Sequence, residues 1–129
     1  MEGCKLLAFL LCDSASKSSD GKVTLHGLFD RIIVPRGPVK AKLFHVFYKI
    51  AIDQPCTVTL RVFDPLNGEI SGNWRDRIGQ PGLVQSVWAL TTSLFKQAGP
   101  YGLKLSLEFN GGKILSLADM LVVVDQQGE

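Results

Sequence analysis

The chain has 129 residues, of which 46% are hydrophobic and 20% are charged, and its formal net charge at pH 7 is +2. This size and composition are typical of one folded domain and exclude an intrinsically disordered chain. The small basic excess argues against nucleic-acid binding, for which a clustered basic face is expected. We therefore expect residues 1–129 to form a single domain.

The amino-terminal stretch shares some features with a secretory signal but does not satisfy the pattern. Leu6–Leu11 is a short apolar run followed by Cys12, whereas the apolar core of a signal usually spans about 7–15 residues. The basic Lys5 is accompanied by the acidic Glu2, and a bulky leucine precedes the cysteine where a small residue is needed. No other run approaches the ~20 apolar residues of a membrane span. We expect no cleaved signal and no membrane partner.

The three cysteines, Cys4, Cys12 and Cys56, suggest a reducing environment. They cannot all pair within one chain, and none has the C-x-x-C spacing of a zinc or redox motif. We expect them to act as small buried apolar residues. A reduced, cytoplasmic setting fits this pattern best.

Taken in order, the segments of the chain predict strands rather than helices. Apolar runs of strand length and period-two alternation recur, and Gly, Pro or Asn separates most of them. The predicted strands cover residues 5–13, 22–34, 39–52, 56–63, 69–78, 83–95, 101–109 and 114–124. The segment Leu83–Phe95 is long enough for a helix, but its valines and threonines favour a strand.

Three connecting features indicate how the strands are joined or interrupted. Ser14–Gly21 is rich in serine and ends in Asp-Gly, so it is predicted to be the flexible tip of a hairpin. Gly27 interrupts the second strand and predicts a bulge or a close backbone approach. Asn110-Gly111 predicts a tight hairpin, of type I′ if two residues form its tip.

About eight strands in a chain of this length cannot bury their apolar faces in one flat sheet. The physical solutions are two packed sheets or a closed barrel. We predict an all-β fold, namely a two-sheet antiparallel β-sandwich of about 7–9 strands that is immunoglobulin-like or jelly-roll-like. This single β-sandwich domain would span residues 1–129.

Three stretches carry a resemblance to a known family. They are LLCDSAS at Leu10–Ser16, GKVTLHGLFDRI at Gly21–Ile32 and AGPYGLKLSLEFNGGKIL at Ala98–Leu115. Together they resemble a bacterial family of small, uncharacterised β-sandwich proteins that is classed as a domain of unknown function. The similarity covers nearly the whole chain, and its first third is the distinctive part. The resemblance implies a fold and no activity, so it assigns no functional residue.

The sequence contains no recognisable catalytic or cofactor motif. His26 and His45 are its two histidines, and neither lies in a zinc-binding or catalytic spacing. No nucleophile elbow, phosphate-binding loop or dinucleotide fingerprint occurs. We expect a protein that is not an enzyme and needs no cofactor. A pair formed by His26 and Asp30 is conceivable, although a hydrogen-bonded surface histidine is the simpler interpretation.

Three aspartates near the first hairpin leave a cation site open as an alternative. Asp13, Asp20 and Asp30 carry the hard oxygen ligands that suit calcium. Their simpler roles are to end a strand, to shape a turn and to pair with a neighbouring arginine. We favour the simpler roles.

Two functional hypotheses follow from apolar and aromatic residues. The third strand is apolar on both faces, which predicts an exposed patch at Phe44, Val46, Tyr48 and Ile50. On this basis we expect a non-catalytic interaction or scaffold protein that forms a homodimer and binds an unidentified protein partner. The alternative is a small-molecule or carbohydrate-binding module in which Trp74, set in a polar strand, stacks on a sugar.

Overall fold

The chain folds into strands that form two sheets, as seen in a computed structural model. The structure describes residues 3–29, 31–34, 42–64, 68, 70–95 and 98–126. The strands are β1 (Lys5–Lys17), β2 (Val23–Phe29), β3 (Arg31–Val34), β4 (Leu43–Ile52), β5 (Cys56–Phe63), β6 (Ile70–Ile78), β7 (Gly82–Thr91), β8 (Gly99–Phe109) and β9 (Ile114–Gln126). A 3-10 turn, η1 (Thr92–Leu94), follows β7.

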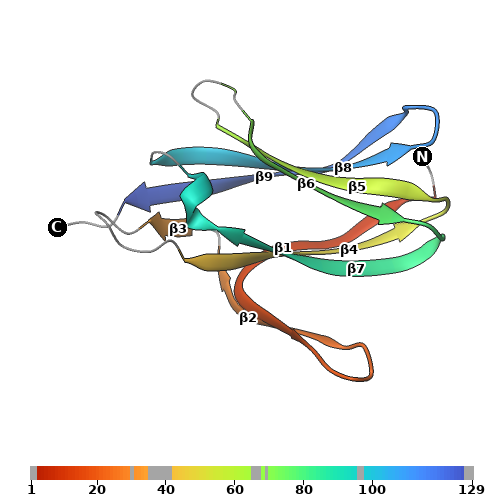
Figure 1. Ribbon diagram of the computed structural model, residues 1–129, viewed down its shortest axis with the longest axis horizontal. Helices are drawn as coiled ribbons and strands as arrows, with labels where there is room; N and C mark the ends of the chain where they lie inside the picture. Colours follow the sequence, from red (N-terminus) through yellow and green to blue (C-terminus); the bar gives the residue numbers. More distant parts are fainter. Residues whose placement is uncertain are drawn as a thin grey trace.

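The two sheets pack face to face as a sandwich (Figure 1). Sheet A has the strand order β2-β1-β4-β7, and sheet B has the order β3-β9-β8-β5-β6. Neighbouring strands are antiparallel except for β3 and β9, which run parallel. The predicted all-β sandwich is therefore confirmed, with one parallel pair added at the edge of sheet B.

The core lies between the sheets and takes alternate residues from each central strand. In sheet B, β5 contributes Val58, Leu60 and Val62, all fully buried. Their partners on β8 are Leu107, Leu105 and Leu103, which are buried as well. Burial of this kind stabilises the fold by roughly 1.5–3 kcal/mol for each large side chain.

The predicted exposed patch on the third strand is wrong. Phe44, Val46, Tyr48 and Ile50 on β4 are 0–3% exposed and belong to the core cluster. The reason is that this set of alternate residues on β4 faces sheet B, which packs on sheet A and buries them. The sandwich itself covers the surface that the sequence suggested a partner would cover.

Several predicted strand boundaries also change. β1 continues to Lys17, so Ser14–Lys17 belongs to a strand and not to the flexible tip. The single strand predicted over residues 22–34 is two strands, β2 in sheet A and β3 in sheet B. Leu83–Phe95 is a strand followed by a 3-10 turn. The β8–β9 loop spans residues 110–113, and because Asn110 has a negative φ the hairpin is not of type I′.

The hairpin made by β1 and β2 does not continue the plane of sheet A. In Figure 1, β1 runs through the lower sheet and then turns back beneath it, so that the tip of the hairpin lies under that sheet. β1 pairs with β4 up to Cys12 and with β2 from Leu11 to Lys17. The second half of β1 is therefore paired with β2 and not with β4, so the two strands can bend together out of the plane of the sheet.

Candidate functional site

The folded-back hairpin covers the outer face of sheet A, the face turned away from sheet B. Phe47 points to this outer face, because the alternate residues of β4 fill the core, yet it is only 7% exposed. On the hairpin, Ala15, Val23 and Leu25 are half-buried, whereas their neighbours Ser16, Thr24 and His26 are exposed. The hairpin thus presents an apolar side to its own sheet.

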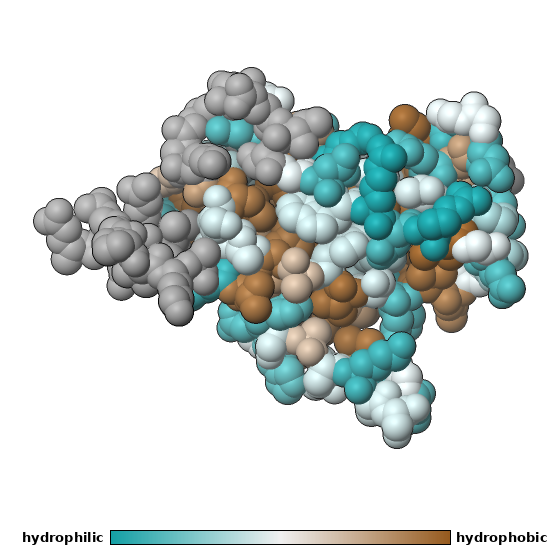
Figure 2. All heavy atoms as spheres, viewed as in Figure 1, coloured by the Kyte–Doolittle hydropathy of each residue, from teal (hydrophilic) through white to brown (hydrophobic). Residues whose placement is uncertain are grey.

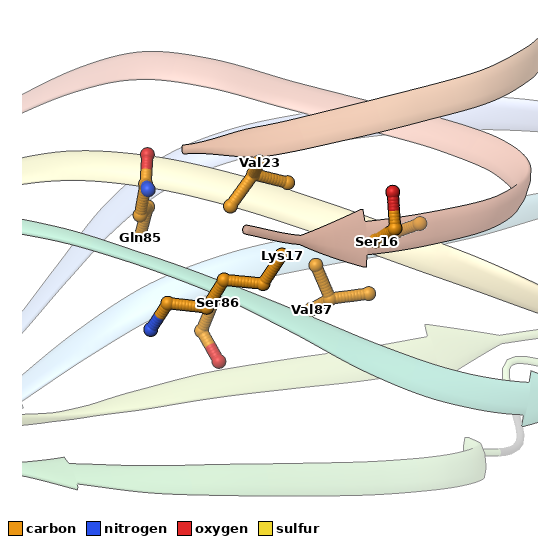
Figure 3. Close-up of a pocket in the computed structure, with 7 residues that line it drawn as sticks. Ser16, Lys17, Val23, Gln85, Ser86 and Val87 are labelled. Atoms are coloured by element: carbon orange, nitrogen blue, oxygen red, sulfur yellow. The ribbon is translucent and has the colours of Figure 1, made fainter. Parts of the chain in front are cut away.

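A cavity of about 260 Å³ lies between this hairpin and β7 (Figure 3). Its walls combine apolar and polar side chains from the two halves of the site, namely Ala15, Ser16, Lys17 and Val23 on the hairpin and Gln85, Ser86 and Val87 on β7. Figure 3 shows Val23 and Val87 in the space between the two elements. The arrangement gives two apolar walls with hydroxyl, amide and ammonium groups around them.

The tip of the hairpin is fastened to β7 by a side-chain hydrogen bond. The Gln85 amide, through Nε2, donates to the backbone carbonyl of Gly21 at 3.1 Å. The tip itself is closed by Ser18, which donates its hydroxyl to Asp20 and accepts a backbone hydrogen bond from Gly21. The hydrogen bond from Ser18 lowers the pKa of the Asp20 carboxyl group. The tip is therefore an ordered turn that a side chain of β7 holds to the sheet.

The hinge of the hairpin is built from a glycine, an aspartate and a histidine. Gly27 has a φ of +69°, and a Cβ atom there would overlap the side chain of Asp13 on the neighbouring strand. The backbone at Gly27 is closely approached, although by the side chain of Asp13 and not by another backbone. His45 on β4 donates from Nδ1 to the backbone carbonyl of Asp13 at 3.1 Å. Cys12, immediately before the hinge, is fully buried.

Trp74 lies at a different place, the open side of the sandwich where β6 and β7 are the sheet edges. It pairs with Leu60, so its ring is turned toward the core, where it is half-buried and lies over Gly72. Figure 2 views the molecule from this side and shows apolar side chains between the two sheets. The ring is not the exposed platform that the sequence suggested.

Asp76, two residues beyond Trp74 on β6, accepts a hydrogen bond from a side chain of the opposing sheet. The hydroxyl of Tyr48 donates to Asp76 Oδ2 at 2.8 Å. The Tyr48 ring also packs against Trp88, with ring centroids 4.7 Å apart. Burial, reinforced by the Asp76 carboxylate, raises the pKa of Tyr48 well above its usual value. This arrangement holds a neutral phenol between the sheets, and its role is to stabilise the fold.

The remaining sequence candidates do not assemble into a site. Asp13 lies at the hinge and Asp20 at the tip, the two ends of the hairpin, and Asp30 lies outside the described residues. Within the described part of the chain, no three His, Cys, Asp or Glu side chains gather closely enough to hold a metal ion. Cys4, Cys12 and Cys56 are free thiols. No described helix has the length and apolar character needed to cross a bilayer.

Comparison with known proteins gives a family and a fold. A family model described as a family of unknown function, DUF6941, matches residues 7–118. The chain belongs to this family. The matched range contains every residue that lines the cavity, and no curated protein matches the chain. The resemblance to a domain of unknown function is thereby confirmed.

Among solved structures, the C-terminal domain of wzt is similar to this chain. The match has a TM-score of 0.58 and 10% sequence identity, and it covers 98% of this chain and 75% of that one. At this identity the likeness concerns the fold alone.

The sequence did contain a signal for the hairpin site that our prediction missed. Ala15, Val23 and Leu25 are apolar residues that alternate with polar ones, which is the pattern of a half-buried strand. The four serines between residues 14 and 19 obscured this pattern because they are typical of a loop. The cavity residues on β7 lie more than sixty positions away in the sequence, and nothing in their neighbourhood indicates that they face the hairpin.

Proposed function

We propose that the protein is a non-catalytic binding module that takes up a small polar organic molecule, of about the size of a monosaccharide, beneath the β1–β2 hairpin. The observation that carries this proposal is the cavity between the hairpin and β7. A hairpin that folds back onto its own sheet and leaves a lined space there is well suited to hold a ligand. Concave sites with apolar walls and a few polar groups are typical of ligand binding.

The size and lining of the cavity support a small ligand with both apolar and hydroxyl-bearing surfaces. Ligand pockets commonly have volumes of about 300–1,000 Å³, and a cavity of about 260 Å³ lies just below that range, so its ligand must be small. Val23 and Val87 offer contact to C–H groups, and Gln85 and Lys17 offer polar contacts. A sugar ring, which has apolar faces and a polar rim, matches this combination.

The test is a titration with single sugars followed by NMR. Glucose, galactose, mannose and N-acetylglucosamine are added separately to the ¹⁵N-labelled protein, and the backbone amide shifts are recorded. We expect at least one sugar to produce saturable shifts at Gln85, Ser86 and Val87, with a Kd in the millimolar range or below. Four titrations without a saturable shift at these amides would contradict the proposal.

A pair of matched variants on β7 locates the binding site. Val87→Trp introduces a large side chain into the cavity and is expected to abolish the saturable shifts. Ala89→Trp places the same side chain two residues further along the same face of β7, outside the cavity lining, and should bind as the wild type does. Equal binding by the wild type and Val87→Trp would place the ligand elsewhere and refute this site.

Self-association is a second candidate function, supported by the edge of sheet A. β7 is ten residues long, contains neither charge nor proline, and pairs with β4 without a register shift. No described strand pairs with its other side. Edge strands in monomers are usually protected by charges, prolines or bulges, and β6, the opposing edge, carries Arg75, Asp76 and Arg77. We infer that β7 can pair with β7 of a second copy to form a dimer.

A further inference from the structure

The outer face of sheet B carries a cluster of arginines. Arg61 lies on β5, and Arg75 and Arg77 lie on β6, all on the face turned away from the core because their neighbours Leu60, Trp74 and Ile78 face inward. Figure 2 shows hydrophilic side chains over the part of the molecule where β5 and β6 lie. This cluster is on the other sheet from the hairpin cavity.

One carboxylate serves two of these arginines. Glu108 on β8 accepts a hydrogen bond from Arg61 Nη2 at 3.3 Å, and Arg75 Nη2 lies 3.9 Å from the same oxygen, Oε1. The side chains of Arg61 and Glu108 are 29% and 26% exposed, so solvent screens this pair only partly. The lysine nearby on β8 is engaged elsewhere, since Lys104 lies 3.9 Å from Asp119.

Arg77 adds a third guanidinium without a counterion. It lies two residues beyond Arg75 on the same face of β6, and no carboxylate of the described residues is within ion-pairing distance of it. The cluster therefore has an excess of two positive charges, as large as the formal net charge of the whole chain. Repulsion among the three guanidiniums is relieved only in part by Glu108.

A buried hydroxyl without a partner lies in the middle of this cluster. Thr59 on β5 pairs with Arg75 on one side and with Ser106 on the other, and it precedes Arg61 by two residues. Its side chain is fully buried, and no described group lies within hydrogen-bonding distance of its Oγ1. Leaving a buried polar atom without a hydrogen-bond partner destabilises a fold, so its presence in a native protein calls for an explanation.

We propose that Thr59, Arg61, Arg75 and Arg77 form a binding site for an oxyanion, that is, for a phosphate or carboxylate group of a ligand. The oxyanion takes the place of the Glu108 carboxylate between Arg61 and Arg75, and Arg77 adds charge. Guanidinium groups bind phosphate and carboxylate through paired hydrogen bonds. The Thr59 hydroxyl donates to one ligand oxygen, which satisfies the atom that has no partner in the free protein.

This site is tested with two small anions. Sodium phosphate and sodium succinate are titrated separately into the ¹⁵N-labelled protein at constant ionic strength, set with sodium chloride, and the Nε–H signals of Arg61 and Arg75 are followed by NMR. We expect saturable shifts with at least one anion. A response to phosphate alone identifies a phosphate-bearing ligand, and a response to succinate alone identifies a carboxylate. Shifts that do not saturate with either anion, as with chloride, would overturn the proposal.

Variants that are expected to weaken or to strengthen anion binding make the test specific for this site. Arg75→Gln should weaken binding of the responding anion at least fivefold. Glu108→Gln should strengthen it severalfold, because the competing internal carboxylate is gone. Lys22→Gln removes an exposed cation at the hairpin tip and should leave the affinity unchanged. Equal affinity in the wild type, Arg75→Gln and Glu108→Gln would overturn the site.

Thr59→Val separates a ligand contact from a structural role. Valine has nearly the shape of threonine and lacks the hydroxyl, so the free variant should be at least as stable as the wild type because an unsatisfied polar atom is removed. The same variant should bind the anion at least threefold more weakly. Loss of stability in urea together with unchanged anion affinity would show that the hydroxyl serves the fold and not a ligand.

Discussion

At the scale of single residues, Tyr48 shows how the sandwich holds a polar group inside an apolar core. The residue is fully buried, and its hydroxyl donates to Asp76, which lies on the opposing sheet. The pair connects an interior strand of sheet A to the edge strand of sheet B. A hydrogen bond to a charged acceptor is worth about 1.5–3 kcal/mol. Tyr48 therefore fixes the distance between β4 and β6 as well as filling space.

We predict that Tyr48→Phe lowers the free energy of unfolding by about 1–3 kcal/mol. The change removes one oxygen and leaves the half-buried Asp76 carboxylate without this donor. Urea unfolding at pH 7 measures the loss, and Asp76→Asn, which retains an acceptor oxygen, should lose less. An unchanged urea midpoint for Tyr48→Phe would contradict the assigned role.

Because the pKa of Tyr48 is raised, the effect of Tyr48→Phe on the free energy of unfolding should depend on pH. An unfolded tyrosine ionises near pH 10, whereas the folded phenol stays neutral to higher pH because of burial and Asp76. The unfolded state thus releases its proton first, so the stability contributed by Tyr48 is complete below about pH 10 and declines above it. The stability difference between the wild type and Tyr48→Phe should therefore narrow between pH 9 and pH 11 in urea titrations.

At the scale of elements, the bend of the β1–β2 hairpin depends on backbone conformation as well as on side chains. Gly27 occupies a region of φ that favours glycine, and the Asp13 side chain fills the space where its Cβ would be. His45 then holds the Asp13 carbonyl from the sheet. These contacts let the hairpin leave the plane of sheet A and cover Phe47.

We predict that Gly27→Ala destabilises the protein by about 1–3 kcal/mol and loosens the hairpin. Gly111→Ala is the matched control, because Gly111 also has a positive φ but has no atom within 4 Å of the added Cβ. Gly111→Ala should lower the free energy of unfolding by less than Gly27→Ala does, because it adds backbone strain without a steric overlap. Urea unfolding measures both variants.

A second measurement on Gly27→Ala reports on the hinge directly. Cys12 is fully buried beside the hinge, and burial raises the pKa of its thiol, so it should resist iodoacetamide in the wild type. Alkylation of Cys12, located by mass spectrometry, should be faster in Gly27→Ala than in Gly111→Ala. Equal rates in the two variants would mean that the hinge does not depend on Gly27.

Strands were predicted well from the sequence where apolar and polar residues alternate regularly. They were predicted poorly where the chain passes from one sheet to the other. Cys56–Phe63 was predicted with both boundaries correct because its pattern of apolar and polar residues is regular. The change from sheet A to sheet B between β2 and β3 was missed, since residues 22–34 keep a strand-like composition throughout. No pattern within that stretch specifies which sheet each part joins.

At the scale of the whole molecule, the edge of sheet A leads to a prediction about assembly. We expect the protein to form a dimer at micromolar to millimolar concentration through β7. Ala89→Lys puts a charge on this edge strand and should shift the equilibrium toward the 14.1 kDa monomer. Ser116→Lys adds the same charge to β9 in the other sheet, away from β7, and serves as the control. Sedimentation equilibrium measures all three proteins, and a monomeric wild type would refute this assembly.

The sandwich was predictable from the sequence, but neither candidate site was. The number and length of apolar strands left few ways to bury them, so composition and periodicity sufficed for the fold class. The four residues on β4 were misplaced because a strand that is apolar on both faces does not reveal which face another sheet covers. Trp74 was misplaced because its polar neighbours on β6 suggested an exposed strand. The hairpin cavity and the arginine cluster depend on strand order and register, which connect residues far apart in the chain.

The parallel pairing of β3 with β9 constrains the order in which the chain can fold during synthesis. Arg31 pairs with Val123, so β3 is made long before the strand that will hold it. The β1–β2 hairpin, in contrast, is local in sequence and can form early. A ribosome translating at about 5–20 residues per second would take several seconds to deliver β9. During that interval Ile32, buried in the finished protein, lacks β9 beside it, so an apolar strand stays open to contact with other chains.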